Sequence, residues 1–78
     1  MAANTLPLSM VSVGETVRLV KVVAGKKLVK RLTSMGLTPG VEIRVVQNLG
    51  GPLTIAVRDS RVALGFGAAH KILVEKSE

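Results

Sequence analysis

The sequence has few of the residues that carry chemistry, and each shortage excludes a class of function. Cysteine is absent, which excludes disulfides, thiolate zinc sites and cysteine nucleophiles. Tyrosine and tryptophan are also absent, and His70 is the only histidine. The acidic residues are scattered, so they suggest neither an acid–base pair nor a metal cluster; they are Glu15, Glu42, Asp59, Glu75 and Glu78. We therefore expect no enzyme, no catalytic residue, no cofactor and no metal site. Weak metal binding at a subunit interface, and the oligomeric state itself, stay open.

Long hydrophobic runs are missing too. Charges interrupt every apolar stretch, so no segment is long enough to cross a bilayer. Residues 1–7 have neither the basic start nor the apolar run of a secretory signal, and we expect a cytoplasmic protein. Aliphatic residues are abundant: 47% of the 78 residues are hydrophobic, yet Phe66 is the only aromatic one. Such a composition favours strands, and the length supports one domain over 1–78, with its core at about 8–75.

Alternation of apolar and polar residues predicts five short strands. The first covers 16–23, with Val17 and Leu19 on one face, and its alternation slips near Val22 and Val23, as a bulge would cause. The other strands are expected around 41–45, 53–58, 62–64 and 72–75.

The segments between and around these strands are short. Residues 8–11 are expected to form a lead-in, 65–70 a single helical turn, and 76–78 a frayed tail. Short strands with tight connections suggest a small closed or nearly closed barrel, because closure removes exposed strand edges. The fold class predicted from the residues is therefore mainly β.

One helix is inserted after the first strand. Leu28, Leu32 and Met35 are spaced i, i+4, i+7, which predicts an amphipathic helix of about three turns that covers one end of the barrel. Gly25 can serve as its N-cap. Gly36 follows the last apolar position, where a left-handed residue commonly ends a helix.

The loop after this helix has a specific turn sequence. Residues 38–41, Thr-Pro-Gly-Val, fit a type II turn, in which Pro39 supplies the fixed φ and Gly40 the positive φ. Leu37 lies between the helix end and this turn, where an exposed leucine would offer a partner a hydrophobic contact. Backbone geometry alone explains the glycines and the proline, so docking is the second interpretation of this loop.

The charge is strongly basic, with 11 Lys and Arg against five Asp and Glu, a net charge of +6. Such a surface prefers nucleic acid, anionic headgroups or an acidic protein face. The polar side of the predicted helix carries the largest cluster; such faces are usually only solvated, but this one is also a candidate docking surface. Nucleic acid is disfavoured, because no Tyr or Trp offers a stacking platform. The candidate partner-binding residues are Lys26, Lys27, Lys30, Arg31, Gly36, Leu37, Pro39 and Gly40.

Taken in order, motifs spread from Leu8 to Val74 resemble the FeoA family, the small cytosolic accessory proteins of bacterial ferrous iron transport. Each piece can be explained by a turn or a strand, whereas the ordered set at these spacings is fairly specific. The motifs are Arg31-Leu32, Met35-Gly36-Leu37, Pro39-Gly40-Val41 with Ile43 and Val45, Gly51-Pro52, Ile55 and Val57, Val62-Ala63-Leu64, Ala69, and Ile72 with Val74.

The resemblance implies an SH3-like β-barrel with an inserted helix. It also implies a partner, the membrane ferrous iron transporter FeoB, and a regulatory or assembly role that reaches the inner membrane only through that partner. In many members the position of Gly65 is Arg and that of Ala68 is acidic, whereas both are small and uncharged here. Two alternatives stay open: an SH3-like regulatory domain as in metal-dependent repressors, and a basic nucleic-acid-binding barrel.

Overall fold

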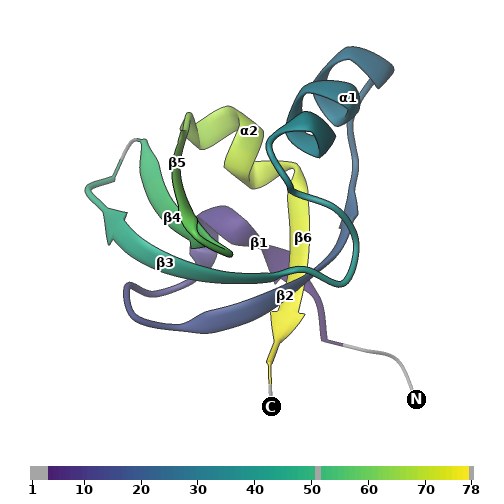
Figure 1. Cartoon of the computed structure of the whole chain (residues 1–78). Helices are drawn as coiled ribbons and strands as arrows, with labels where there is room; N and C mark the ends of the chain where they lie inside the picture. The colour runs from purple at the N-terminus through teal and green to yellow at the C-terminus, as the bar shows by residue number, and fades with distance from the viewer. Residues whose placement is uncertain (1–3, 51, 78) are drawn as a thin grey trace.

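The structure is a computed structural model that describes residues 4–50 and 52–77. One antiparallel sheet forms most of it, and two helices lie at one end of that sheet (Figure 1). The elements in chain order are β1 Leu6–Pro7, the 3-10 helix η1 Leu8–Met10, β2 Thr16–Val22, α1 Lys26–Ser34, β3 Glu42–Asn48, β4 Leu53–Val57, β5 Ser60–Leu64, α2 Phe66–His70 and β6 Ile72–Lys76.

The sheet has six strands in the order β1-β6-β2-β3-β4-β5, with β1 and β5 as its unjoined edges. The mainly β class is confirmed, but the sheet is strongly curved and not closed, so the expectation of a barrel holds only loosely. The sixth strand, β1, pairs Leu6 with Val74 and Pro7 with Leu73. Sequence reasoning missed it, because two residues that include a proline show no alternation.

Two irregularities in the strand pairing accompany this curvature. Between β2 and β6 the register shifts between Leu19 and Lys21, and between β3 and β4 it shifts between Val45 and Gln47. Bulges increase local twist and bend a strand. The irregularity expected near the end of the first strand is therefore present, but it lies slightly earlier than Val22.

The core is aliphatic and follows the alternation that the sequence shows. In β4, Leu53, Ile55 and Val57 are buried while the residues between them are half-buried. Leu32 from α1 and Ala69 from α2 complete the same cluster, so both helices are anchored on the sheet.

The C-terminal end of α1 corrects one expectation from the sequence. Gly36 has φ +89°, its N–H donates to the Thr33 carbonyl, and the Leu37 N–H donates to the Leu32 carbonyl, both at 3.0 Å. This is a Schellman motif, in which the residue after the glycine packs back onto the helix. Leu37 is accordingly 1% exposed, so the expectation of an exposed leucine was wrong.

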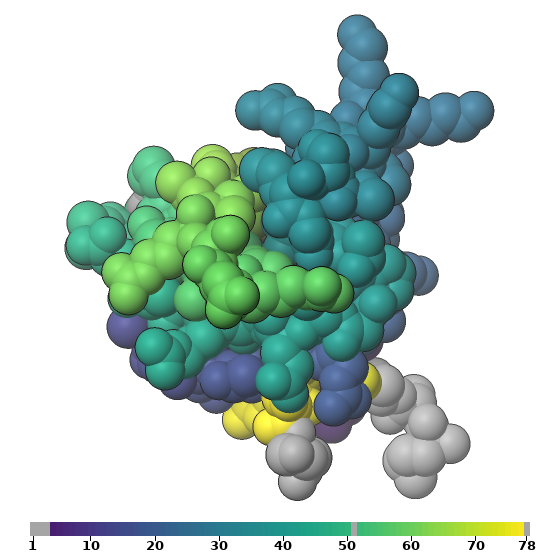
Figure 2. Space-filling view, in the orientation of Figure 1, coloured from purple at the N-terminus to yellow at the C-terminus, as the bar shows by residue number. Residues whose placement is uncertain are grey.

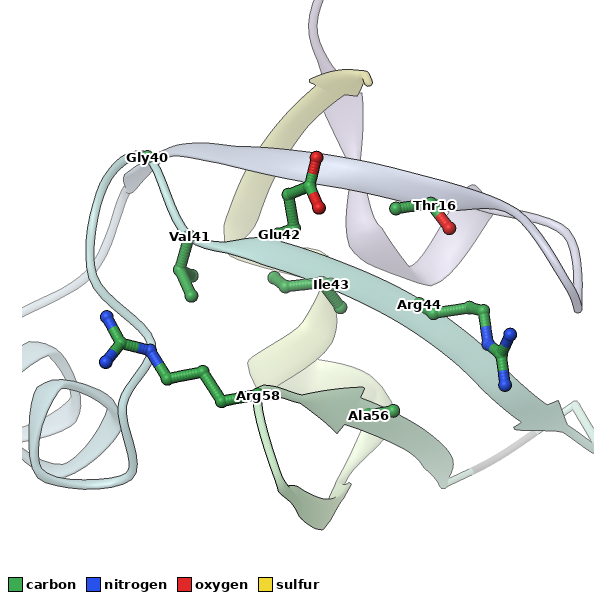
Figure 3. A pocket seen from close by; sticks show the side chains of 8 residues that line it. All are labelled: Thr16, Gly40, Val41, Glu42, Ile43, Arg44, Ala56 and Arg58. Carbon is green, nitrogen blue, oxygen red and sulfur yellow. The ribbon is translucent and has the colours of Figure 1, made fainter. Parts of the chain in front are cut away.

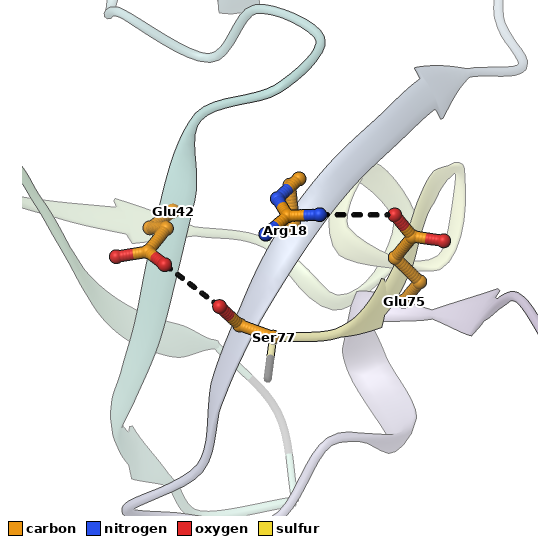
Figure 4. Close-up of polar contacts among 4 residues, drawn as sticks. All are labelled: Arg18, Glu42, Glu75 and Ser77. Atoms are coloured by element: carbon orange, nitrogen blue, oxygen red, sulfur yellow. Dashed lines mark hydrogen bonds and ion pairs between the residues drawn. The ribbon is translucent and has the colours of Figure 1, made fainter.

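The C-terminal segment is also more ordered than expected. Lys76 ends β6 and forms an ion pair with Glu15 at 3.7 Å. The Ser77 hydroxyl donates to the Glu42 carboxylate at 2.7 Å, beside the Arg18–Glu75 ion pair at 3.5 Å (Figure 4). The frayed tail is therefore wrong for residues 76 and 77, and Glu78 lies outside the described residues.

Replacing Leu37 with alanine tests the burial of this residue. We expect Leu37→Ala to lower the free energy of unfolding by about 2–5 kcal/mol, because it opens a cavity in the core. Leu49→Ala is the control: that side chain is 79% exposed, and surface changes usually stay within about 0.5 kcal/mol. Urea denaturation measures both, and equal effects would contradict the burial of Leu37.

Candidate functional site

The polar face of α1 is an exposed, positively charged surface. Lys26, Lys27, Lys30 and Arg31 are all exposed, and Figure 2 shows the long side chains of α1 extending away from the body. Lys26 and Lys27 occupy the first helical positions, which contain no acidic residue, and the N-cap Gly25 makes no side-chain hydrogen bond. Cations at a helix N-terminus oppose the helix dipole. Helix stability therefore does not explain them.

Three of the five acidic residues lie near the end of β6. Residues 16–41 and 60–74, which include both helices, contain no Asp or Glu. Glu15, Glu42 and Glu75 instead contact residues of β2 and the C-terminal segment through the bonds described above. That end of β6 lies away from α1 (Figure 1). The charge of the protein is thus divided, with an excess of positive charge around the helices.

The loop after α1 is held firmly against β2. The Gly40 N–H donates to the Leu19 carbonyl at 2.8 Å, and the Leu19 N–H donates to the Val41 carbonyl at 2.9 Å. Gly40 has φ +93°, and the Val41 N–H donates to the Thr38 carbonyl at 3.1 Å, so the predicted turn is confirmed. Pro39 and Gly40 are exposed and can contact a partner, while Gly36 is half-buried.

An apolar groove that the sequence did not predict lies beside the basic face. It has a volume of about 250 Å³ and separates α1 from α2 and the end of β5. Leu28 and Met35 form one wall, and the small residues Ala63, Gly65 and Ala68 leave the space on the other. Arg31 lines the groove and also belongs to the basic face. A partner's apolar side chain could enter the groove while acidic groups beside it meet the lysines.

His70 has a structural role. Its Nδ1 lies 3.1 Å from the Ser9 hydroxyl oxygen, and its ring stacks on Phe66 with centroids 6.0 Å apart. The contact with Ser9 joins α2 to η1, and the stacking on Phe66 lies within α2. Within residues 4–50 and 52–77, no three His, Cys, Asp or Glu residues come together in a way that could hold a metal ion. No helix of the described residues is long and apolar enough to span a membrane.

The described residues thus form a small β-sheet domain with a basic helix and an adjacent apolar groove. The family model for the FeoA domain matches residues 6–76. The chain therefore belongs to the FeoA family, and its fold is the SH3-like fold found in that family.

Individual relatives agree with this assignment. A protein of Methanocaldococcus jannaschii named as an Fe(2+) transport protein A is 40% identical over 72 residues, which cover 92% of this chain and 88% of the relative. The crystal structure of an iron uptake regulatory protein, FeoA, is similar with a TM-score of 0.89 and 36% identity, covering 95% of this chain and all of that one.

A manganese-dependent transcriptional repressor has the same fold at a TM-score of 0.90 and 21% identity. The similarity covers 99% of this chain but 44% of the repressor chain. This likeness therefore concerns the fold alone.

Proposed function

We propose that this chain is a cytosolic, non-enzymatic accessory protein of ferrous iron uptake that binds the cytosolic region of a FeoB-type transporter. Membership of the FeoA family supports the connection with ferrous iron transport. The partner surface consists of the α1 face, with Lys26, Lys27, Lys30 and Arg31, together with the exposed turn at Pro39 and Gly40. Leu37 is not part of this surface, because its side chain is in the core.

One observation carries the proposal: the basic face and the apolar groove share Arg31 and form a continuous surface. Protein interfaces commonly combine an apolar centre with a polar rim, and complementary charge guides the partner into register. The cations of α1 do not take part in the two ion pairs of the described residues. They remain available for carboxylates of the transporter.

The alternatives have less support. The repressor likeness extends to the fold alone, and the chain spans less than half of that protein. Nucleic-acid binding would need stacking platforms, and Phe66, the only aromatic residue, already stacks on His70.

A charge reversal on α1 tests the basic face. We expect Lys27→Glu to weaken binding to the purified cytosolic region of the transporter about five- to tenfold, since it replaces an attraction by a repulsion. The effect should shrink at high salt because exposed charges are screened. Lys71→Glu makes the same change at an exposed position outside α1. Isothermal titration calorimetry compares the two; equal losses would indicate attraction by net charge alone, without a role for α1.

Filling the groove tests its apolar part. Gly65 lines the groove, Gly67 does not, and a Cβ added at either position would meet no atom within 4 Å. We expect Gly65→Leu to weaken transporter binding about tenfold or more, because the leucine side chain would occupy the groove and exclude the partner's apolar side chain. Gly67→Leu should bind like the unmodified chain, and thermal melting should show that both variants fold. Full binding by a folded Gly65→Leu protein would exclude the groove from the interface.

A further inference from the structure

A second groove crosses the outer face of the sheet, over β2, β3 and β4 (Figure 3). It is shallow, has a volume of about 610 Å³, and is lined by residues that include Thr16, Arg44, Ala56 and Arg58. The surface proposed for the transporter reaches only the edge of this groove, at Gly40. Two of its features bear on function: the positive charge of its arginines and the backbone strain at Arg58.

Two arginines flank Ala56 on the neighbouring strands, and a third lies in the turn that follows β4. Strand pairing places Arg44 of β3 on one side of Ala56 and Arg61 of β5 on the other. Arg58 lies in the turn directly after β4 and lines the groove. Their positive charges lie on one face of the sheet, and neither ion pair of the described residues includes these arginines. An anion that approached this face would be attracted by them.

The backbone conformation of Arg58 also supports a binding role for this groove. Among the described residues it is the only one other than glycine with a positive φ, +56°. The turn between β4 and β5 would be less strained with Gly or Asn, which adopt this conformation readily. Strained residues persist where their side chain serves a function. In Figure 3 the Arg58 guanidinium reaches toward the Gly40–Val41 loop, while Arg44 extends toward the opposite end of the groove.

The negative charge of Glu42 favours one class of anionic ligand over others. It also lines the groove, and its carboxylate accepts the hydrogen bond from Ser77, which holds it toward the C-terminal segment (Figure 4). A continuous row of phosphates, in nucleic acid or at a lipid surface, would pass close to this negative charge. A polypeptide that carries separate carboxylates can place them at Arg44 and Arg58 and leave an uncharged residue beside Glu42.

We propose that this groove binds an extended acidic segment of a partner protein, with Arg44 and Arg58 each holding one carboxylate. Arginine presents paired N–H donors that match a carboxylate. The groove is a second interaction surface, distinct from the α1 face, and the proposal does not depend on the identity of the transporter as partner.

Titration of the ¹⁵N-labelled chain with the peptide acetyl-(Glu-Thr)₄-amide tests the proposal by NMR. Saturable shifts are expected at the amides of Thr16, Arg44 and Ala56, and none with acetyl-(Gln-Thr)₄-amide. The double variant Arg44→Gln/Arg58→Gln should weaken peptide binding about tenfold or more, as expected for lost charge-assisted hydrogen bonds. The matched control Lys26→Gln/Lys27→Gln removes the same charge from α1 and should change the affinity by less than about threefold.

Three results would overturn the proposal. The first is an equal loss of peptide affinity in the two double variants, which would show that net charge alone accounts for the binding. Peptide shifts confined to α1 would place the peptide elsewhere. The third is displacement of the peptide by oligothymidylate or by phosphatidylglycerol vesicles. If these competitors bind the unmodified chain but not Arg44→Gln/Arg58→Gln, the groove belongs to another class of ligand.

The variant Arg58→Gly separates binding from structure. Because glycine accepts the positive φ without strain, we expect the melting temperature to rise by about 2–6 °C, while the affinity for the glutamate peptide falls. A lower melting temperature would show that Arg58 stabilises the turn itself, and unchanged affinity would show that it does not contact the peptide. Either result would contradict the proposed role of Arg58.

Discussion

Leu32 and Leu37 together fix where α1 lies, and the basic face and the groove beside it depend on that placement. Both side chains are buried in the core, and a backbone hydrogen bond joins the Leu37 N–H to the Leu32 carbonyl. The helix is nine residues long, which is too short to be stable by itself. Its lysines can therefore present a defined surface only because the apolar side of the helix end is packed on the sheet.

Local signals in the sequence were sufficient for α1 and the turn that follows it. The spacing of Leu28, Leu32 and Met35 defined the buried side, and the glycines at 36 and 40 marked the two positive-φ positions of this segment. Leu37 was misjudged because its burial depends on the direction in which the chain leaves the helix. Once the Schellman motif is known, a buried apolar residue after the glycine is the expected arrangement.

Features that depend on pairing between distant segments were not available from the sequence. The edge strand β1 forms through its pairing with Leu73 and Val74 of β6. The sheet is open because its two edge strands, β1 and β5, do not pair with each other. Both grooves also depend on contacts between segments that are distant in the sequence. The gap beside α1 needs Ala63 and Ala68 to be brought opposite the helix, and the arginines at 44 and 61 become neighbours only across Ala56. Alternation predicts which face a residue is on, but not what lies beside it.

The separation of charge along the molecule has a consequence for how the protein meets other molecules. With three of its carboxylates near the last strand and an excess of ammonium and guanidinium groups near the helices, the protein carries a permanent electric dipole. The field of an acidic surface exerts a torque on this dipole, which turns the helical end toward that surface before any contact forms. A larger fraction of diffusional encounters is then productive, and this advantage declines as dissolved ions shorten the range of the field.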